Sequence, residues 1–480
     1  MSRIKVLSAV SEIFPLVKTG GLADVAGALP LALAEDGVDV TSLVPGYPAV
    51  MKSLESVQEV LTEPDLFGGK VRVLSGRSSG LDLFVIDAPH LFDRSGGLYL
   101  GPDGRDWPDN AFRFGALGWM AARIAGGQIP ALLPDVLHCH DWQPSLALAY
   151  LAYGGGRRCP SVVTVHNLAY QGQFPAGLLH ALRLPPHSFH IDGVEYYGAI
   201  GFLKAGLRFA DRITTVSPTY AREIQTPEHG FGMDGLLRTR ADVLSGITNG
   251  IDTDVWNPLS DTHIPVSYGR TNPERRSGNK AELQRRSGLE HDPSALLFGV
   301  VSRLVSQKGI DLIADVTPLL VEHGAQLALL GTGDAELESR LAALSLQYPG
   351  RIACIIGYDE DLAHLIQASV DALLVPSRSE PCGLTQLCAL RYGAIPVVGK
   401  VGGLADTVAD TLESEEPTGF HFSPITAPAF ETVLRRVFSA WLDKQFWRRL
   451  QLNAMRTDVS WRKSAEQYAR LFSGLLQTKR

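Results

Sequence analysis

The sequence predicts an α/β protein made of two doubly wound units. Short apolar runs rich in β-branched residues recur along the 480 residues, and stretches with helical spacing of apolar residues lie between them. Helices between successive strands imply mostly parallel sheets. The series of runs pauses once near the middle of the chain and then resumes, so we expect two similar halves.

Each half has its own series of predicted strands. In the first half these are Ile4 to Val10, Val38 to Val44, Leu81 to Ile86, Val136 to His138, Val162 to His166 and Ile213 to Val216. In the second half they are Leu296 to Val301, Leu327 to Leu330, Ile352 to Ile356, Ala372 to Val375 and Ile395 to Val398. Helical spacing of apolar residues over 22–35 and 110–125 predicts crossover helices in the first half.

Two other stretches depart from this alternation. From Ser260 to Arg286 the chain is rich in Ser, Asn, Arg, Pro and Gly and poor in apolar residues, so we expect a connection or surface excursion that packs no core. The final stretch, Asp458 to Lys479, places Trp461, Tyr468 and Phe472 on one face of a helix. We therefore expect a terminal docking helix.

Composition excludes several classes of protein. The 44 basic and 51 acidic side chains leave a net charge of −7, so no global positive field exists to hold nucleic acid or an anionic membrane. No stretch approaches the roughly 18 uninterrupted apolar residues of a membrane span, and the run after Met1 meets Glu12 and Pro15 before it becomes a signal core. The five scattered cysteines include no Cys-x-x-Cys pair, which argues against a disulfide framework or structural zinc and favours a reducing cytoplasm.

Both halves carry a Gly-Gly-Leu-Ala-Asp phrase, at Gly20 to Asp24 and at Gly402 to Asp406, just before a predicted apolar helix. A glycine pair there lets the backbone approach a phosphate or sugar closely, with amide groups pointing at the ligand. Doubly wound sheets bind ligands beyond the carboxyl ends of their strands, so we expect both turns at one cleft. Lys18 precedes the first pair and can face a diphosphate, although a tight turn with a solvated lysine is the alternative.

Two strand ends of the second half carry groups suited to a nucleoside diphosphate. Arg303 and Lys308 precede a helix that starts near Ile310, and with its dipole they can stabilise a departing diphosphate without a metal ion. Glu380 follows another strand, where a carboxylate can accept hydrogen bonds from sugar hydroxyls, and Thr385 can donate to phosphate or ribose. Exposed basic residues and a solvated glutamate are the alternatives.

Polar residues also end two apolar runs of the first half, His138 to Trp142 and Thr164 to Asn167. We disfavour a metal site there, because strand alternation places Cys139 opposite the two neighbouring histidines and no further ligand pair follows. We expect Asp141 next to an acceptor hydroxyl and His166 beside the reacting carbon. An Asp-x-Asp sequence beginning at Asp252 follows an Asn-Gly turn, and we interpret it as turn and linker structure rather than as a cation site.

Six separated segments, in this order, together resemble bacterial and plant glycogen and starch synthases. They are Lys18 to Val25, His138 to Gln143, His166 to Gly172, Asn249 to Asp252, Arg303 to Gly309 and Glu380 to Gln386. The match covers nearly the whole chain. The resemblance implies a GT-B fold, in which two Rossmann-like domains face each other across a deep cleft and a C-terminal helix crosses back to the first domain. We expect these parts at 1–248, 249–457 and 458–480.

The resemblance also implies the reaction, a transfer of glucose from ADP-glucose to the non-reducing 4-hydroxyl of an α-1,4-glucan such as glycogen. Retention at the anomeric carbon and the absence of a metal ion or other cofactor belong to this expectation. One alternative is a related transferase that uses UDP-glucose to make sucrose, trehalose phosphate or a cell-wall glycoside. Another is a glucan-binding or regulatory protein without activity.

The same resemblance implies a role in the site for individual residues, according to their positions in the matching segments. Donor binding is expected of Lys18, Thr19, Gly20, Gly21, Asn167, Asn249, Arg303, Lys308, Tyr358, Cys382, Gly383, Leu384 and Thr385. Acceptor binding is expected of Asp24, Tyr99 and Asp141, and catalysis of Asp141, His166, Arg303, Lys308 and Glu380. In this assignment Tyr358 stacks on adenine, and the backbone carbonyl of His166 supports a positively charged transition state. Cys388 stands where the wider superfamily often has a second glutamate, which favours front-face displacement over a two-glutamate mechanism.

Overall fold

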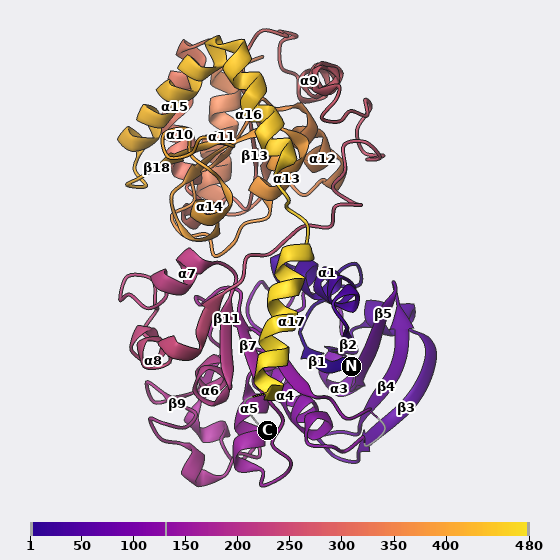
Figure 1. Cartoon of the computed structure of the whole chain (residues 1–480). Coiled ribbons are helices and arrows are strands. Elements are labelled where there is room, and N and C mark those ends of the chain that lie inside the picture. Colours follow the sequence, from indigo (N-terminus) through magenta and orange to yellow (C-terminus); the bar gives the residue numbers. More distant parts are fainter. Residues whose placement is uncertain (1–2, 130–131, 478–480) are drawn as a thin grey trace. The chain divides into compact units, whose positions relative to one another are not determined.

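Two units make up the chain, each built around its own mainly parallel β-sheet (Figure 1). The computed structural model describes residues 3–129 and 132–477. The first unit takes in Met1–Asn249 and Trp461–Arg480, and the second takes in Gly250–Ser460. The divisions expected from the sequence follow residues 248 and 457.

The sheet of the first unit has nine strands in the described residues, in the order β12-β11-β7-β6-β1-β2-β5-β4-β3. Their bounds are β1 Ile4–Ala9, β2 Val38–Pro45, β3 Glu55–Glu63, β4 Val71–Ser78, β5 Leu81–Asp87, β6 Val136–His140, β7 Ser161–Val165, β11 Arg212–Thr215 and β12 Leu244–Gly246. The strands from β12 to β5 run parallel, and β4 and β3 add an antiparallel edge. The predicted strands of the first half are confirmed, whereas β3, β4 and β12 are additional.

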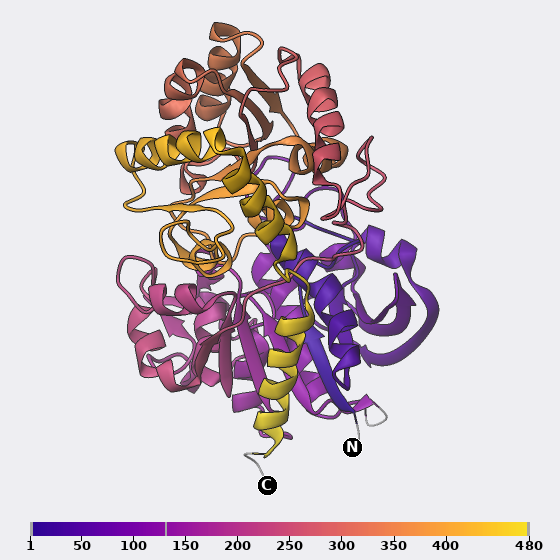
Figure 2. The same ribbon diagram turned by 45° about the horizontal axis from the view of Figure 1, so that its top comes forward.

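The C-terminal helix α17 (Arg462–Gln477) docks on the first unit beside α1 (Gly21–Glu35), as Figures 1 and 2 both show. Its residues Tyr468 and Phe472 share a buried cluster with Val25 of α1 and with apolar residues of β1 and β6. Burial of two aromatic side chains supplies much of the apolar area that holds such a helix in place.

The other helices of this unit are α2 Pro48–Ser53, α3 Pro89–Phe92, α4 Asn110–Ala125, α5 Leu146–Tyr153, α6 Phe202–Phe209, α7 Pro218–Glu223 and α8 Asp234–Thr239. A small antiparallel sheet joins β8 Gln173–Pro175, β10 Ala199–Gly201 and β9 Glu195–Tyr196.

The second unit has a fully parallel sheet in the order β15-β14-β13-β16-β17-β18. Its strands are β13 Leu297–Val301, β14 Gln326–Gly331, β15 Ile352–Ile356, β16 Ala372–Val375, β17 Ile395–Gly399 and β18 Phe420–Phe422. Its helices are α9 Arg276–Ser287, α10 Ile310–Glu322, α11 Ala335–Gln347, α12 Glu360–Ser369, α13 Thr385–Tyr392, α14 Gly402–Thr407, α15 Ala427–Leu442 and α16 Lys444–Arg456. Two buried clusters use alternate residues of the same strands, as expected for a sheet covered on both faces. In the described part of either unit, no helix has the length and apolar character of a membrane span.

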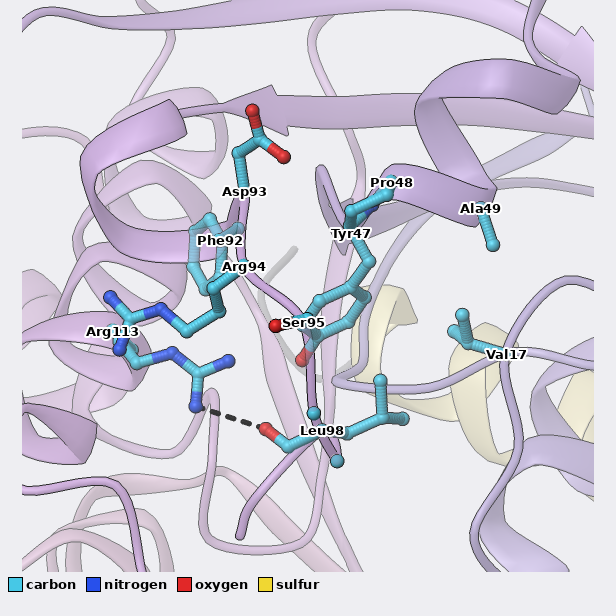
Figure 3. A pocket seen from close by; sticks show the side chains of 12 residues that line it. Val17, Tyr47, Pro48, Ala49, Phe92, Asp93, Arg94, Ser95, Leu98 and Arg113 are labelled. Carbon is cyan, nitrogen blue, oxygen red and sulfur yellow. Dashed lines mark hydrogen bonds between the residues drawn. The ribbon is translucent and has the colours of Figure 1, made fainter. Parts of the chain in front are cut away.

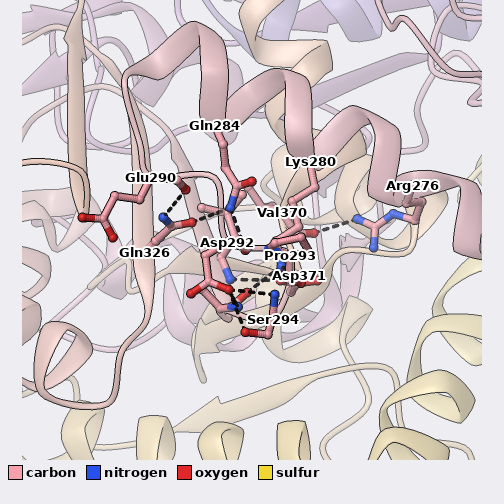
Figure 4. A network of polar contacts seen from close by, with 12 residues as sticks. Arg276, Lys280, Gln284, Glu290, Asp292, Pro293, Ser294, Gln326, Val370 and Asp371 are labelled. Atoms are coloured by element: carbon pink, nitrogen blue, oxygen red, sulfur yellow. Dashed lines mark hydrogen bonds and ion pairs between the residues drawn. The ribbon is translucent and has the colours of Figure 1, made fainter.

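The segment from Ser260 to Arg286 is predicted from the sequence to be a connection or surface excursion that packs no core. It contributes buried residues such as Tyr268 and Leu283 to the second unit, so the expectation that it packs no core is wrong. Its residues from 276 onward form α9, which buries mainly polar side chains, together with the apolar Leu283. Lys280 Nζ lies 2.8 Å from the Asp371 carboxylate, and Gln284 donates to the Gln326 side chain at 2.7 Å (Figure 4). A count of apolar residues misses such a helix, because its burial depends on satisfied hydrogen bonds.

Candidate active site

A buried glutamate organises the loop between β1 and α1. Glu12 is 3% exposed, and its carboxylate accepts hydrogen bonds from the Thr19 hydroxyl at 2.8 and 2.9 Å, the Gly20 amide at 3.3 Å and the Tyr99 hydroxyl at 3.1 Å. Burial raises the pKa of Glu12, and these hydrogen bonds oppose that rise. Sequence reasoning missed this residue, whose only signal is its place just after the first strand.

The same loop carries Lys18 and Asp24, which the structure brings together. Lys18 Nζ lies 2.8 Å from Asp24 Oδ1, and both side chains are partly exposed. A side chain at Gly20 would meet no atom of the described chain within 4 Å, so the space above this turn is open. Gly21 is the first residue of α1, a helix of 15 residues whose first amides and positive dipole end favour anions. Lys18, paired with Asp24, and the N-terminal end of α1 therefore lie together at this turn.

Asp141 joins the ends of β6 and β7. Its Oδ1 accepts the backbone amide of His166 at 2.7 Å and that of Asn167 at 3.4 Å. Asp141 itself has a φ of 59°, a left-handed conformation that a non-glycine residue adopts only where its surroundings impose it. Burial raises the pKa of this carboxyl to about 7, against the effect of the two amides. Asp141 therefore fixes the backbone at His166 and Asn167.

Three histidine rings lie in a row next to this turn. His138 and His140 have ring centroids 4.0 Å apart, and those of His140 and His166 are 5.3 Å apart. His140 Nδ1 and His166 Nε2 share a hydrogen bond at 3.0 Å, and His138 Nε2 bonds the Thr164 hydroxyl at 2.6 Å. Burial lowers the pKa of His138 and His166 well below the usual range and that of His140 to about 3. Burial thus favours the neutral form of all three rings. No group of three or more His, Cys, Asp or Glu side chains in the described residues is arranged to hold a metal ion.

In the second unit, Lys308 and Glu380 form an ion pair between two strand ends. Lys308 Nζ lies 2.6 Å from Glu380 Oε2, and the side chains are 19% and 9% exposed. The Ser377 hydroxyl donates to the same carboxylate oxygen at 3.0 Å. A side chain at Gly309 would lie 2.1 Å from the Pro376 carbonyl oxygen, so glycine lets the two loops approach. A partly desolvated cation and a carboxylate are held side by side as a result.

A bidentate ion pair fixes these two loops to each other. Arg378 donates to both carboxylate oxygens of Asp311, at 2.7 and 2.6 Å, and to the Ser306 carbonyl at 2.6 Å. Bidentate arginine pairs are geometrically specific as well as strong. Arg303 lies just after β13 with its side chain exposed. The loop therefore holds Lys308 rigidly and leaves Arg303 accessible.

The two glycines of the second Gly-Gly-Leu-Ala-Asp phrase, which we expected to let the backbone approach a ligand, pack against the backbone of the Glu380 loop. Gly402 has a φ of 42°, and a side chain there would lie 2.0 Å from the Glu380 carbonyl oxygen. At Gly403 a side chain would lie 2.3 Å from the Cys382 carbonyl oxygen, and the Gly403 amide donates to the Glu380 carbonyl at 3.0 Å. The close approach that these glycines permit is to their own chain. They seat the loop that carries Glu380.

The other expected donor residues are spread over several loops. Tyr358 is 80% exposed, and its hydroxyl donates to Glu360 at 2.5 Å. Gly383 has a φ of 74°, and Thr385 begins α13. Cys382 is buried, and Leu384 is the residue just before that helix. Asn249 ends the first unit, and its buried Oδ1 has no hydrogen-bond partner among the described residues.

Each unit therefore brings part of the predicted set together. In the first unit, the turns after β1, β6 and β7 hold Lys18 to Asp24, Asp141, His166 and Asn167, and Tyr99 reaches the first turn through Glu12. In the second unit, the turns after β13 and β16 hold Arg303, Lys308, Glu380 and residues 382–385. Apart from Tyr99, which lies in the loop after α3, these residues follow the carboxyl ends of parallel strands, where doubly wound sheets bind ligands.

Comparison with known proteins agrees with this arrangement. The starch synthase catalytic domain family matches residues 5–239, and the glycosyl transferases group 1 family matches residues 280–449. A glycogen synthase of Rhodopseudomonas palustris is 57% identical, with 99% of each protein covered, and one of Methylocella silvestris is 56% identical, with 100% of each covered.

Two solved structures extend the comparison. The catalytic domain of starch synthase IV from Arabidopsis thaliana, bound to ADP and acarbose, matches with a TM-score of 0.89 at 30% identity over 99% of both chains. A sucrose-phosphate synthase from Thermosynechococcus elongatus, at 16% identity and a TM-score of 0.57, shares the fold alone. The chain belongs to the glycogen and starch synthase family, glycosyltransferases whose two Rossmann-like domains form the GT-B fold.

Proposed function

We propose that the protein transfers glucose from ADP-glucose to the non-reducing 4-hydroxyl of an α-1,4-glucan, with retention at the anomeric carbon. The observation that carries this proposal is the ion pair of Lys308 and Glu380, at 2.6 Å, beside a helix N-terminus at the carboxyl edge of the second sheet. Such a pair offers a cation to a diphosphate and a carboxylate to the hydroxyls of the attached sugar. The Arabidopsis relative, solved with ADP and acarbose, supports the choice of ligands.

We assign the diphosphate to Lys308 and Arg303, which follow β13. Lys18, which precedes α1, stays an expected donor contact of the first unit. Negative charge accumulates on the leaving diphosphate as the glycosidic bond breaks, and fixed cations that meet it lower the barrier. Glu380 keeps Lys308 in position beforehand and accepts hydrogen bonds from the glucose. The other expected donor residues, Thr19, Gly20, Gly21, Asn249 and residues 382–385, would supply backbone and hydroxyl contacts.

The turn at His166 is the part of the first unit that we propose to face the anomeric carbon. Asp141 holds the amides of His166 and Asn167, and so it sets the direction of the His166 carbonyl. That carbonyl oxygen would stabilise the positive charge of an oxocarbenium-like transition state. Asp141 itself is assigned a positioning role and not that of a nucleophile, because its Oδ1 accepts both of these amides. Front-face displacement, in which the acceptor hydroxyl enters on the side of the departing diphosphate, fits this site.

Donor choice separates this proposal from its main alternative. Tyr358 exposes a ring that can stack on adenine, whereas uracil offers a smaller stacking area. Initial rates with ADP-glucose and with UDP-glucose, each with and without maltohexaose, test the assignment. We expect ADP release that depends on the glucan. Faster turnover with UDP-glucose would favour the other class of transferase, and glucan binding without any ADP release would favour a binding protein.

We also propose a cytoplasmic location, because the scattered cysteines suit a reducing compartment.

A further inference from the structure

Buried polar side chains also gather outside the residues expected to act on donor or acceptor. In the first unit they lie beside a pocket of about 580 Å³, where Arg113 donates to the Leu98 carbonyl at 2.9 Å (Figure 3). Arg113 also donates to the Leu91 carbonyl at 2.9 Å and to the Asn110 side chain at 2.7 Å. These bonds tie α4 to α3 and to the loop that follows α3, which is a structural role.

In the second unit, a buried histidine anchors the start of α12. His364 is 1% exposed, its Nδ1 lies 2.8 Å from Asp261 Oδ2, and its ring stacks on Trp256 with centroids 3.9 Å apart. The Tyr392 hydroxyl of α13 donates to the same Asp261 oxygen at 2.5 Å. Buried polar groups that satisfy each other hold their elements in one arrangement. The first turns of α12 are therefore fixed to the segment 256–261 and to α13.

Two more pairs hold the same end of the helix. Asp359 caps α12, because its Oδ1 accepts the Leu362 amide at 2.8 Å, and Arg286 of α9 donates to its Oδ2 at 3.2 Å. His263 Nδ1 lies 2.6 Å from Asp361 Oδ1. Caps and paired acidic residues stabilise the N-terminal turn of a helix. The backbone at the first residue of α12 is therefore held from both sides.

This first residue is Glu360, and its two oxygens face different partners. Oε1 lies 3.8 Å from His364 Nε2, and Oε2 accepts the Tyr358 hydroxyl at 2.5 Å. Tyr358 is 80% exposed and follows Gly357, whose φ of 144° is a conformation that suits glycine. An exposed side chain loses rotamer freedom when a ligand packs against it. Glu360 restrains the Tyr358 ring before a ligand arrives, and so it lowers this cost.

We propose that Glu360 is a positioning residue for the nucleotide base, which holds the Tyr358 ring in the orientation that stacks on adenine. This inference rests on the proposed function, in which Tyr358 contacts adenine. The hydroxyl serves only to orient the ring, since stacking uses the ring face. Restraining one side chain beforehand corresponds to about threefold to tenfold in affinity. Glu360 thereby favours ADP-glucose over donors with a smaller base.

Titration calorimetry of the full chain with ADP and with UDP, at one pH and ionic strength, tests the proposal. We expect Glu360→Ala and Tyr358→Phe each to weaken ADP about threefold to tenfold. The double variant should weaken ADP no further, because both single changes remove the same hydrogen bond. The loss for UDP should be smaller, since uracil stacks over less area. Glu360→Gln should keep the affinity for ADP, because its amide oxygen still accepts the hydroxyl.

Glu336→Ala is the matched control. It removes an exposed glutamate from the first turn of α11, a helix that follows the neighbouring strand of the same sheet. We expect its affinity for ADP to equal that of the natural protein. Glu336→Ala and Glu360→Ala should lower the urea midpoint of the second unit by similar small amounts, since each removes one acidic side chain near a helix N-terminus.

Unchanged ADP affinity in Glu360→Ala would overturn the proposal, and so would losses that multiply in the double variant or an equal loss for UDP. Tighter ADP binding in Glu360→Ala would show that the hydrogen bond holds the ring away from the base. Tyr358→Ala separates this inference from the proposed function. If Tyr358→Ala weakens ADP and Glu360→Ala does not, only the positioning role fails. If Tyr358→Ala binds ADP as the natural protein does, the adenine assignment fails and the positioning role fails with it.

Discussion

Lys308 Nζ lies 2.6 Å from Glu380 Oε2, although 72 residues separate the two in sequence. The pair joins the loops after β13 and β16, and the Arg378 to Asp311 ion pair holds those loops together. The cation is therefore fixed before any diphosphate arrives. Preorganised charge of this kind costs no reorganisation during the reaction.

We predict that Lys308→Ala and Glu380→Ala each lower turnover by two decades or more. That loss corresponds to about 3 kcal/mol, the scale of one electrostatic stabiliser. Initial rates of ADP release with maltohexaose as acceptor measure it. Lys400→Ala is the matched control, because it breaks an exposed ion pair with Glu413 of the same length, 2.6 Å. Full activity in either site variant contradicts the assignment.

Glu12→Ala should impair the loop that carries Lys18. It removes the acceptor for the Thr19 and Tyr99 hydroxyls and the Gly20 amide. Hydrogen bonds to a charged group contribute about 1.5–3 kcal/mol each, so we expect kcat/KM for ADP-glucose to fall at least tenfold. Glu59→Ala, on the exposed edge strand β3, is the control. Equal kcat/KM values for the two variants would show that Glu12 does not position the loop.

Asp141 should make stability depend on pH in a defined window. Burial raises its pKa from 3.8 to about 7, so the folded protein binds this proton more tightly than the unfolded chain does. Its contribution is fully present below pH 3.8 and is lost as the pH rises through about 7, by up to roughly 1.4 kcal/mol per pH unit. Asp141→Asn keeps an oxygen for the amides of His166 and Asn167 but does not titrate. The difference between the thermal unfolding midpoints of the natural protein and Asp141→Asn should therefore change between pH 3.8 and about 7. A difference that stays constant over this range would contradict the prediction.

The buried pair of α9 should matter more for folding than for catalysis. Lys280 and Asp371 side chains are 8% and 11% exposed and lie 2.8 Å apart. Lys280→Ala leaves Asp371 buried without its cation, which we expect to cost about 3–5 kcal/mol of unfolding free energy. Arg448→Ala breaks an exposed pair with Glu274 and should cost about 1 kcal/mol or less. Urea unfolding curves, read at the transition of the second unit, give the unfolding free energies of the two variants. Equal losses would show that α9 is not anchored by this pair.

Gly402→Ala should disturb the loop that carries Glu380. The new side chain would lie 2.0 Å from the Glu380 carbonyl oxygen, at a φ of 42°. Because backbone must move to relieve this contact, we expect turnover to fall by about tenfold or more while the sheet stays folded. Gly156→Ala is the control, since a side chain there meets no atom of the described chain within 4 Å. Undiminished turnover in Gly402→Ala would exclude this positioning role.

The sequence pattern predicts the fold class correctly because buried parallel strands are continuous apolar runs, as in Leu297–Val301. It misses β3, whose first five residues are exposed and include Glu55, Gln58 and Glu59, because an edge strand needs no apolar alternation. It misjudges α9 because Lys280 and Gln284 look like surface residues until their partners are known.

Some residues of the candidate site can likewise be predicted from the sequence, and others are revealed only by the structure. Motif residues such as Lys308 and Glu380 are visible in the sequence because their types suit diphosphate and sugar chemistry. Glu12 is invisible there, because a single glutamate after a strand resembles any solvated carboxylate. The role of Gly402 depends on which backbone lies opposite it, and only the tertiary structure shows that this is Glu380.

The central claim is that the cations of the protein hold the diphosphate of the glucosyl donor. A crystal structure of the ADP complex, grown with Mg²⁺ present, tests it most directly. The account predicts diphosphate oxygens within hydrogen-bond distance of Lys308 and Arg303. A diphosphate bound chiefly through Mg²⁺, or bound away from Lys308, would contradict it.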